Sequence, residues 1–249
     1  MKLKKQMLLG LSGKAGSGKD TVGQFIHEYT NARKVAFAGK LKEFVSSITG
    51  ISRENLDNRD VKKSELNNNW NVRSFVNEYN SHIIKAPFIK DGVIFGQEID
   101  KTPLTVRELL ILIVNNLRNT VHENIWVNAL FSQYKAINEE LRASMGNVLD
   151  YSACDFPNWI ITDVRYLNEV EAIKSRRGII IRLERELSED IKHESETSLD
   201  NYNKFDYTIH NNSDLKSLRE YVRTILVTEG YIDDEFKSEF DIDPKKLEL

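Results

Sequence analysis

Hydrophobic and polar positions alternate along the chain in a pattern typical of strands that each lead into a helix. Five apolar runs have the length and composition of buried parallel strands, at residues 7–12, 34–38, 159–163, 178–184 and 206–211. Between them, helical periodicity predicts helices at 19–30, 39–49, 104–118, 125–144 and 166–177, and Ser213 is the expected N-cap of a last helix. This alternation predicts an open parallel sheet of the α/β class.

The segment 51–103 breaks this rhythm. Its first part is polar and rich in Asn, and its second part predicts a hairpin that turns at Lys90-Asp91-Gly92. We interpret the segment as an insertion that forms a small subdomain or flap on a main domain of residues 1–230. Residues 231–249 are acidic and lack a long apolar period, which predicts a loosely attached C-terminal tail.

Composition narrows the functional classes. The chain has 249 residues, of which 40% are hydrophobic, so it can bury the core of one sizeable domain. Its net charge of −3 gives no overall basic field, which argues against a nucleic-acid polymer as partner. The single Cys154 excludes an internal disulfide, and no apolar run approaches the roughly 20 residues that cross a bilayer. We expect a soluble cytoplasmic protein with no membrane partner, and the sequence leaves a homodimer open.

A glycine-rich loop carries the clearest chemical signal. The run Gly13-Lys14-Ala15-Gly16-Ser17-Gly18-Lys19 satisfies G-x-x-x-x-G-K, and it stands between an apolar strand and a helix, as a phosphate-binding loop requires. Successive backbone N–H groups would face a β-phosphate, and Lys19 would reach the β- and γ-phosphates. Thr21 is placed to contact the α-phosphate. The alternative is an ordinary glycine turn between strand and helix.

Asp20 occupies the position where this loop usually has Ser or Thr. A bare carboxylate ~4 Å from a phosphate oxygen is repelled by about 4 kcal/mol at a surface-like dielectric. Its place in the first turn of a helix returns only ~0.3–1 kcal/mol. Repulsion therefore wins unless a cation intervenes, so we expect Mg²⁺ here, with Asp20 serving it directly or through water. The alternative is an acid at a helix start that faces solvent.

The run GKAGSGKDT resembles the loop of bacteriophage-type deoxynucleoside monophosphate kinases, in which Asp after the loop lysine is usual. Further similar blocks follow in the family's order and span most of residues 7–228; they are FAGKLK, TVRELL, IWVNAL, TDVRYLNE, HESE and FDYTIHNNSDLKSL. One departure is ILIVN at 111–115, where Ile111 replaces a usual glutamine. The resemblance implies a P-loop kinase-like three-layer fold with a five-stranded parallel sheet. It also implies transfer of the γ-phosphoryl of ATP to a deoxynucleoside monophosphate, with Mg²⁺.

The resemblance also points to residues on the acceptor side. Arg107, near a helix start, and Arg165, just past a strand end, are the candidates for the acceptor phosphate, because a guanidinium meets phosphate oxygens in pairs. Asp163 ends its strand like a Walker-B acid and is expected to serve Mg²⁺ through water or to orient the acceptor. For Arg107 and Arg165 a surface charge is the alternative.

The remaining candidates are weaker. Those for the substrate pocket are Gly39, Lys42, Trp126 and Glu169, the last expected to brace Arg165 or to touch the sugar. Arg185 is the preferred arginine of a lid over ATP, with Arg176 and Arg177 as alternatives, and Asn211 and Asn212 are expected beside the adenine or in a turn. Ordinary surface or core positions are the alternative for each of them.

Two other functions stay open at this stage. One is a P-loop kinase for another small acceptor, such as dephospho-coenzyme A or phosphomevalonate. The other is an ATP-binding interaction module without catalysis, which would use the insertion to contact a protein. The histidines and the cysteine show no metal-ligand spacing, so we expect no structural zinc.

Overall fold

The computed structural model describes residues 6–66, 104–135, 156–185 and 197–233, together with the strand residues 89–90 and 93–94. The chain divides into two compact units. The first unit comprises residues 1–40 and 124–249, and the second comprises residues 41–123.

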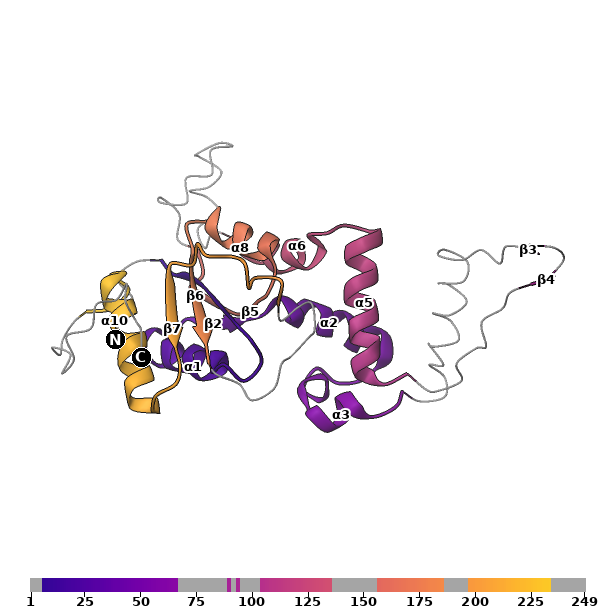
Figure 1. The fold of residues 1–249 in the computed structure, drawn as a ribbon, viewed down its shortest axis with the longest axis horizontal. Helices are drawn as coiled ribbons and strands as arrows, with labels where there is room; N and C mark the ends of the chain where they lie inside the picture. Colours follow the sequence, from indigo (N-terminus) through magenta and orange to yellow (C-terminus); the bar gives the residue numbers. More distant parts are fainter. Residues whose placement is uncertain are drawn as a thin grey trace. The chain divides into compact units, whose positions relative to one another are not determined.

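The first unit is built on a five-stranded sheet (Figure 1). Its strands are β1 (Leu8–Gly13), β2 (Arg33–Val35), β5 (Trp159–Val164), β6 (Ile179–Glu184) and β7 (Tyr207–His210). Their order is β2-β5-β1-β6-β7, and every neighbouring pair is parallel. The predicted five-stranded parallel sheet is confirmed.

Helices cover both faces of this sheet, which makes three layers (Figure 1). On one face, α1 (Lys19–Thr30) and α10 (Leu215–Thr228) pack on alternate strand residues such as Leu9. On the other face, α6 (Ile125–Phe131) and α8 (Leu167–Lys174) pack on residues such as Leu8 and Ile180. Because both faces are covered, the strands read as continuous apolar runs in the sequence.

Three predicted boundaries are wrong. The second strand ends at Val35, and α2 (Phe37–Thr49) begins inside the predicted strand 34–38. The helix starts there because the Asp163 carboxylate accepts hydrogen bonds from its first two backbone N–H groups. Helix α6 ends at Phe131 rather than 144, and the buried Tyr134 packs on Trp159 beyond it; residues 136–155 lie outside the described chain.

The third wrong boundary is the N-cap of the last helix. The cap of α10 is Asp214, not Ser213, and its carboxylate accepts from the Ser217 N–H at 2.8 Å. The expected tail also needs a correction at its start, because Tyr231 and Ile232 are buried in the core of the first unit. A tail therefore begins after Ile232 at the earliest.

The part of the second unit that the structure describes is mainly helical. It holds the later turns of α2, a short 3₁₀ helix η1 (Asn55–Asp57), α3 (Arg59–Lys63) and α5 (Val106–Thr120). Thr105 and Glu108 cap α5 reciprocally, and Leu66 donates a backbone hydrogen bond to Leu104. The antiparallel pair β3 (Ile89–Lys90) and β4 (Val93–Ile94) confirms the predicted hairpin. Among the described residues, no helix combines the length and apolar content that crossing a bilayer takes.

Candidate functional site

The glycine loop joins the carboxyl end of β1 to the start of α1. Its backbone requires glycine at two positions where a side chain has no room. A Cβ on Gly13, with φ of 149°, would lie 2.5 Å from the Leu183 carbonyl oxygen. One on Gly18, with φ of 100°, would lie 2.4 Å from Nδ2 of Asn211. The two glycines thus let the loop take left-handed backbone angles while it packs closely against β6 and Asn211, as the tight turn of a phosphate-binding loop requires.

A residue distant in the sequence, Asn211, holds the loop in place. Asn211, directly after β7, donates from Nδ2 to the Ser17 carbonyl at 2.8 Å, and its own N–H bonds to the Glu184 carbonyl. The side chain is buried, so this hydrogen bond is shielded from water. Asn211 was expected beside the adenine or in a turn; its contact is with the loop itself.

Lys19 and Ser17 are the polar side chains that the loop encloses. The Lys19 ammonium donates to the carbonyl oxygens of Gly13, at 2.5 Å, and Lys14, at 2.7 Å. The Ser17 hydroxyl is buried and has no hydrogen-bond partner among the described residues. A buried hydroxyl without a partner costs about 1–3 kcal/mol, so a ligand oxygen that reached Ser17 would recover part of that cost.

Lys14 connects the loop to β6 through two further charges. Its ammonium lies 3.3 Å from Asp200, whose other carboxylate oxygen accepts from Arg182 at 3.0 Å. Arg182 is 6% exposed and also donates to the Ser12 hydroxyl beneath the loop, at 3.1 Å. The Lys14–Asp200–Arg182 network could not be predicted from the sequence, because Arg182 stands inside an apolar strand and Asp200 has no motif around it.

Asp163, at the carboxyl end of β5, ties α2 to the sheet. Its Oδ1 accepts from the Phe37 N–H and its Oδ2 from the Ala38 N–H, both at 2.8 Å. Strands β1 and β5 are neighbours, with Ser12 opposite Val164, so the glycine loop and Asp163 lie at the same edge of the sheet. The crossovers reverse direction between these strands, which is where such sheets bind ligands.

Glu169 holds the backbone that carries Arg165. One of its carboxylate oxygens accepts from the N–H groups of Arg165, at 2.7 Å, and Tyr166, at 3.0 Å. Glu169 is buried, and the Ser198 hydroxyl also donates to the Arg165 carbonyl. Glu169 was expected to brace Arg165 or to touch the sugar, and the structure shows it bonded to the Arg165 backbone.

Other candidate residues of the first unit lie in different places. Arg176 stands at the C-terminal end of α8 with its guanidinium 4.1 Å from the Phe131 ring centroid, and Arg177 follows it. Because α8 runs back from the carboxyl ends of the strands, both arginines lie at the opposite edge and are not lid residues. Arg185 directly follows β6 at the loop edge and is exposed. Trp126 is only 8% exposed, so it offers little surface to a ligand.

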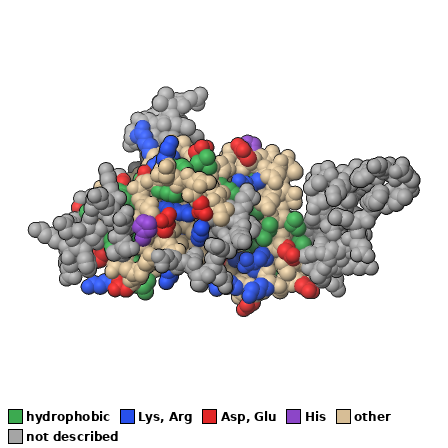
Figure 2. Space-filling model, viewed as in Figure 1, with side chains coloured by type: hydrophobic (Ala, Val, Ile, Leu, Met, Phe, Trp, Pro, Cys, Tyr) green, Lys and Arg blue, Asp and Glu red, His purple; other side chains and the backbone are tan. Residues whose placement is uncertain are grey.

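The second unit contains a group of cations that we call the basic cluster, formed by Lys42, Arg53, Lys62 and Arg107. The Asp57 carboxylate bonds to Lys42 through one oxygen and to Arg53 through the other. The Lys62 ammonium donates to the Asp57 carbonyl at 3.4 Å. In Figure 2, Lys and Arg side chains gather over α3. Lys42 and Arg107 were predicted from the sequence, whereas Arg53 and Lys62 were not, because the polar segment around them has no periodicity.

The charges of the cluster act on one another. Burial lowers the pKa of Lys62, and the positive charges of Lys42, Arg107 and Arg53 lower it further, against the opposite effect of Asp57. Arg107 makes no hydrogen bond or ion pair with the part of the chain that is described. Lys42 and Arg53 pair with the Asp57 carboxylate, and Lys62 and Arg107 add two further positive charges, which suits an anion such as phosphate.

Asp20 and Asp163 lie at the edge of the sheet that carries the glycine loop, and their carboxylates suit a metal ion that binds together with nucleotide phosphates. Within the described ranges there is no group of three or more His, Cys, Asp or Glu side chains that could hold a metal. Asp20 is exposed in the first turn of α1 and bonds to none of the described residues, and the Asp163 carboxylate accepts two backbone hydrogen bonds at the same edge of the sheet. Magnesium is commonly held by one or two carboxylates plus substrate phosphates, so these residues fit Mg²⁺ in kind.

Comparison with known proteins adds to this geometry. No protein-family model matches the chain. It is 25% identical over 196 residues to the deoxynucleoside-5'-monophosphate kinase of Escherichia phage T5, covering 68% of this chain and 72% of that protein. It is 24% identical over 222 residues to a protein of Acanthamoeba polyphaga mimivirus named provisionally as a deoxynucleotide monophosphate kinase, covering 88% and 94%. The resemblance to deoxynucleoside monophosphate kinases is confirmed.

These relatives agree with the fold and support a nucleotide kinase. The alignments reach beyond the glycine loop, because the second one takes in most of both chains. The three-layer arrangement around a parallel sheet is that of a P-loop kinase. The contacts of Lys19 and Asp163 are observed in this chain, and the comparison with the relatives does not test them. The catalytic roles of both residues are predictions.

Proposed function

We propose that the protein is a deoxynucleoside monophosphate kinase, which transfers the γ-phosphoryl of ATP to a deoxynucleoside monophosphate and yields the diphosphate and ADP. The observation that carries this proposal is the glycine loop with Lys19 inside it, at the switch point of a parallel sheet. The basic cluster of the second unit adds a second anion-binding feature. A kinase that joins two anionic substrates needs both.

On the donor side, the proposed roles follow from the loop. Its N–H groups and Lys19 bind the β- and γ-phosphates, and Thr21 stands near the α-phosphate. Bound Mg²⁺ would neutralise charge on the phosphates, with Asp20 and Asp163 as its acids. Lys19 must leave the carbonyls of Gly13 and Lys14 to reach a phosphate, so it exchanges existing hydrogen bonds for stronger charge-assisted ones.

On the acceptor side, cations hold the monophosphate while one of its oxygens attacks the γ-phosphorus. The bond between that phosphorus and the β,γ-bridging oxygen breaks, and ADP leaves. We assign Arg107 and Lys42, supported by Arg53 and Lys62, to the acceptor phosphate, and Arg165 to the charge that develops during transfer. Gly39 lies in the first turn of α2, and Asp163 of β5 accepts hydrogen bonds from the first two N–H groups of that helix, so Asp163 also positions its start.

The test is a coupled assay of ADP release with ATP, Mg²⁺ and a panel of acceptors. The panel contains the four deoxynucleoside monophosphates, the ribonucleoside monophosphates, dephospho-coenzyme A and phosphomevalonate. We expect turnover with at least one deoxynucleoside monophosphate and a loss of ~10²-fold or more in Lys19→Ala. Lys34→Ala, an exposed lysine paired with Gln24, is the matched control and keeps full activity.

Three outcomes would contradict the proposal. Turnover with only dephospho-coenzyme A or phosphomevalonate would assign another kinase activity. Binding of ATP without any acceptor-dependent ADP would indicate an interaction module. Full activity of Lys19→Ala would remove the role of the loop.

A further inference from the structure

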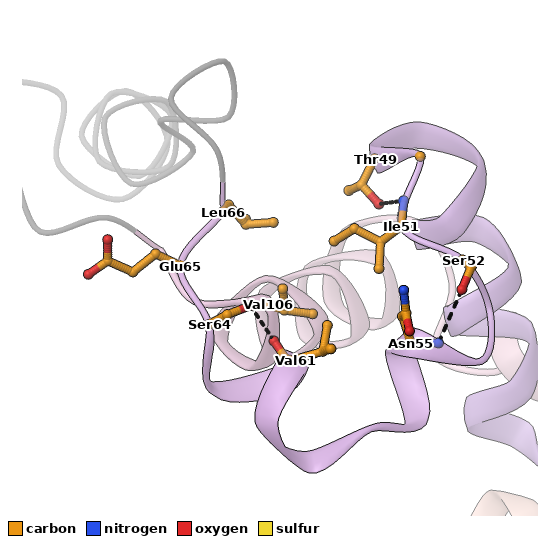
Figure 3. A pocket seen from close by; sticks show the side chains of 10 residues that line it. Thr49, Ile51, Ser52, Asn55, Val61, Ser64, Glu65, Leu66 and Val106 are labelled. Atoms are coloured by element: carbon orange, nitrogen blue, oxygen red, sulfur yellow. Dashed lines mark hydrogen bonds between the residues drawn. The ribbon is translucent and has the colours of Figure 1, made fainter.

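A cavity of about 390 Å³ opens in the second unit, between the end of α2, α3 and the start of α5 (Figure 3). This volume is within the range of small-molecule sites, which is about 300–1,000 Å³. Its wall is mixed, with the apolar side chains of Ile51, Val61, Leu66 and Val106 beside several uncharged polar residues and one acid, Glu65. Such a wall suits a flat, neutral ring with polar edges.

The cavity adjoins the basic cluster along the chain. Three cations of the cluster, Arg53, Lys62 and Arg107, each directly follow a residue that lines the cavity. The Asp57 backbone, which Lys62 contacts, belongs to the same short helix η1 as the lining residue Asn55. A ligand with an anionic end and a neutral ring therefore meets cations and apolar wall within one unit.

Asn55 brings a side-chain amide to this wall, which presents an N–H donor and a carbonyl acceptor side by side. Its backbone N–H bonds to the Ser52 hydroxyl at 3.3 Å, but its side-chain amide bonds to none of the described residues. In Figure 3 that amide reaches between Ile51 and Val61, while the carboxylate of Glu65 points away. Thr49 and Ser64 already donate their hydroxyl protons to backbone carbonyls.

We propose that this cavity binds the base of the acceptor nucleotide and that Asn55 determines which bases are accepted. The proposal rests on the proposed kinase function. A primary amide presents a donor beside an acceptor, which matches the adjacent donor and acceptor on a base edge. The apolar side chains of Ile51, Leu66 and Val106 would pack on the ring. The phosphate of the same nucleotide would extend to the basic cluster.

The experiment measures kcat/KM for dAMP, dGMP, dCMP and dTMP, and for deoxyribose 5-phosphate as an acceptor without a base. Asn55→Ala removes the amide and should lower kcat/KM for the preferred nucleotide by about tenfold or more, with no change for deoxyribose 5-phosphate. Asn55 is exposed, so the variant is expected to fold. Asn115→Ala, an exposed residue of α5 in the same unit, is the matched control.

A second variant tests the direction of the selectivity. Asn55→Asp offers two acceptors and no donor, which suits the two adjacent donors of guanine and opposes the acceptors that flank the single donor of thymine. The ratio of kcat/KM for dGMP over dTMP should rise by about tenfold. The added negative charge also weakens phosphate binding, but it does so for every nucleotide and cancels in the ratio.

The outcomes separate this proposal from the kinase function. Turnover of deoxynucleoside monophosphates whose base ratios are unchanged in both variants, or an equal fall that includes deoxyribose 5-phosphate, overturns the role of Asn55 and leaves the kinase standing. If the wild type shows no turnover, calorimetric titration of the same nucleotides into wild type and variants tests whether Asn55 contributes to base binding. Binding that weakens in Asn55→Ala supports the base site, and binding that is indifferent to Asn55 overturns it.

Discussion

Replacing Asp163 by Ala should destabilise the first unit as well as affect turnover. The variant removes a carboxylate that accepts two hydrogen bonds, from the amides of Phe37 and Ala38, at 2.8 Å each. A hydrogen bond to a charged group contributes about 1.5–3 kcal/mol, and replacing a helix cap by Ala costs about 0.5–2 kcal/mol. Water can reach the partly exposed site and replace some of this, so we expect a loss of about 2–4 kcal/mol in the free energy of unfolding.

Urea unfolding, followed by tryptophan fluorescence, measures this loss. The buried Trp159 begins β5, the strand that carries Asp163, so its emission reports on the first unit. With a slope of about 2–3 kcal/mol per molar urea, the expected loss moves the midpoint down by roughly 1 M. Asp163→Asn keeps one acceptor but turns an amide donor toward the second N–H, so its midpoint should lie between the two.

Asp20→Ala is the matched control for this experiment. It removes an acid from the same edge of the sheet, but this acid bonds to none of the described residues. Its midpoint should therefore shift little, by the equivalent of at most about 1 kcal/mol from the helix dipole. If Asp163→Ala unfolds at the wild-type midpoint while turnover is lost, Asp163 does not hold α2, and its role is confined to the chemistry.

Two further predictions concern the reaction. Asp20→Ala should raise the Mg²⁺ concentration needed for half-maximal turnover several-fold, because one acid that would serve the ion is gone; an unchanged magnesium titration would mean that Asp20 faces solvent. Arg165→Ala should raise KM for the deoxynucleoside monophosphate, or lower kcat, more than it weakens ATP binding measured by calorimetry, since Arg165 follows β5 rather than the loop. An equal loss for both substrates would contradict its assignment to the transferred phosphoryl.

The fold class and the glycine loop could be predicted from the sequence, because each produces a recognisable pattern among neighbouring residues. Strands buried on both faces produce apolar runs, and the glycine loop has fixed spacing between strand and helix. The start of α2 could not be predicted this way, because Phe37 fits a strand or a helix equally well. The decision comes from Asp163, a residue 126 positions further along the chain. Contacts of this kind have no trace in local periodicity.

The basic cluster shows the same limit for the candidate site. Arg53 and Lys62 lie in a polar segment where a charged residue is ordinary, and only the fold gathers them around Asp57. In the sequence, Arg182 is a charged residue within an apolar strand, and only the folded structure shows its hydrogen bond to Asp200. In both cases the signal is the number of charges in one place, which is a property of the folded chain.

Most of the cations assigned to phosphates already have partners within the protein. Lys19 bonds to two carbonyls, Lys14 pairs with Asp200, and Lys42 and Arg53 share Asp57. A phosphate that binds there replaces an existing contact, so the affinity gained is a difference between two interactions. Arg107 differs, because it bonds to nothing in the described chain and lies near the charge of Lys62. A phosphate at Arg107 displaces no bond and relieves repulsion, which makes it the cation of the cluster with the most to gain from the acceptor.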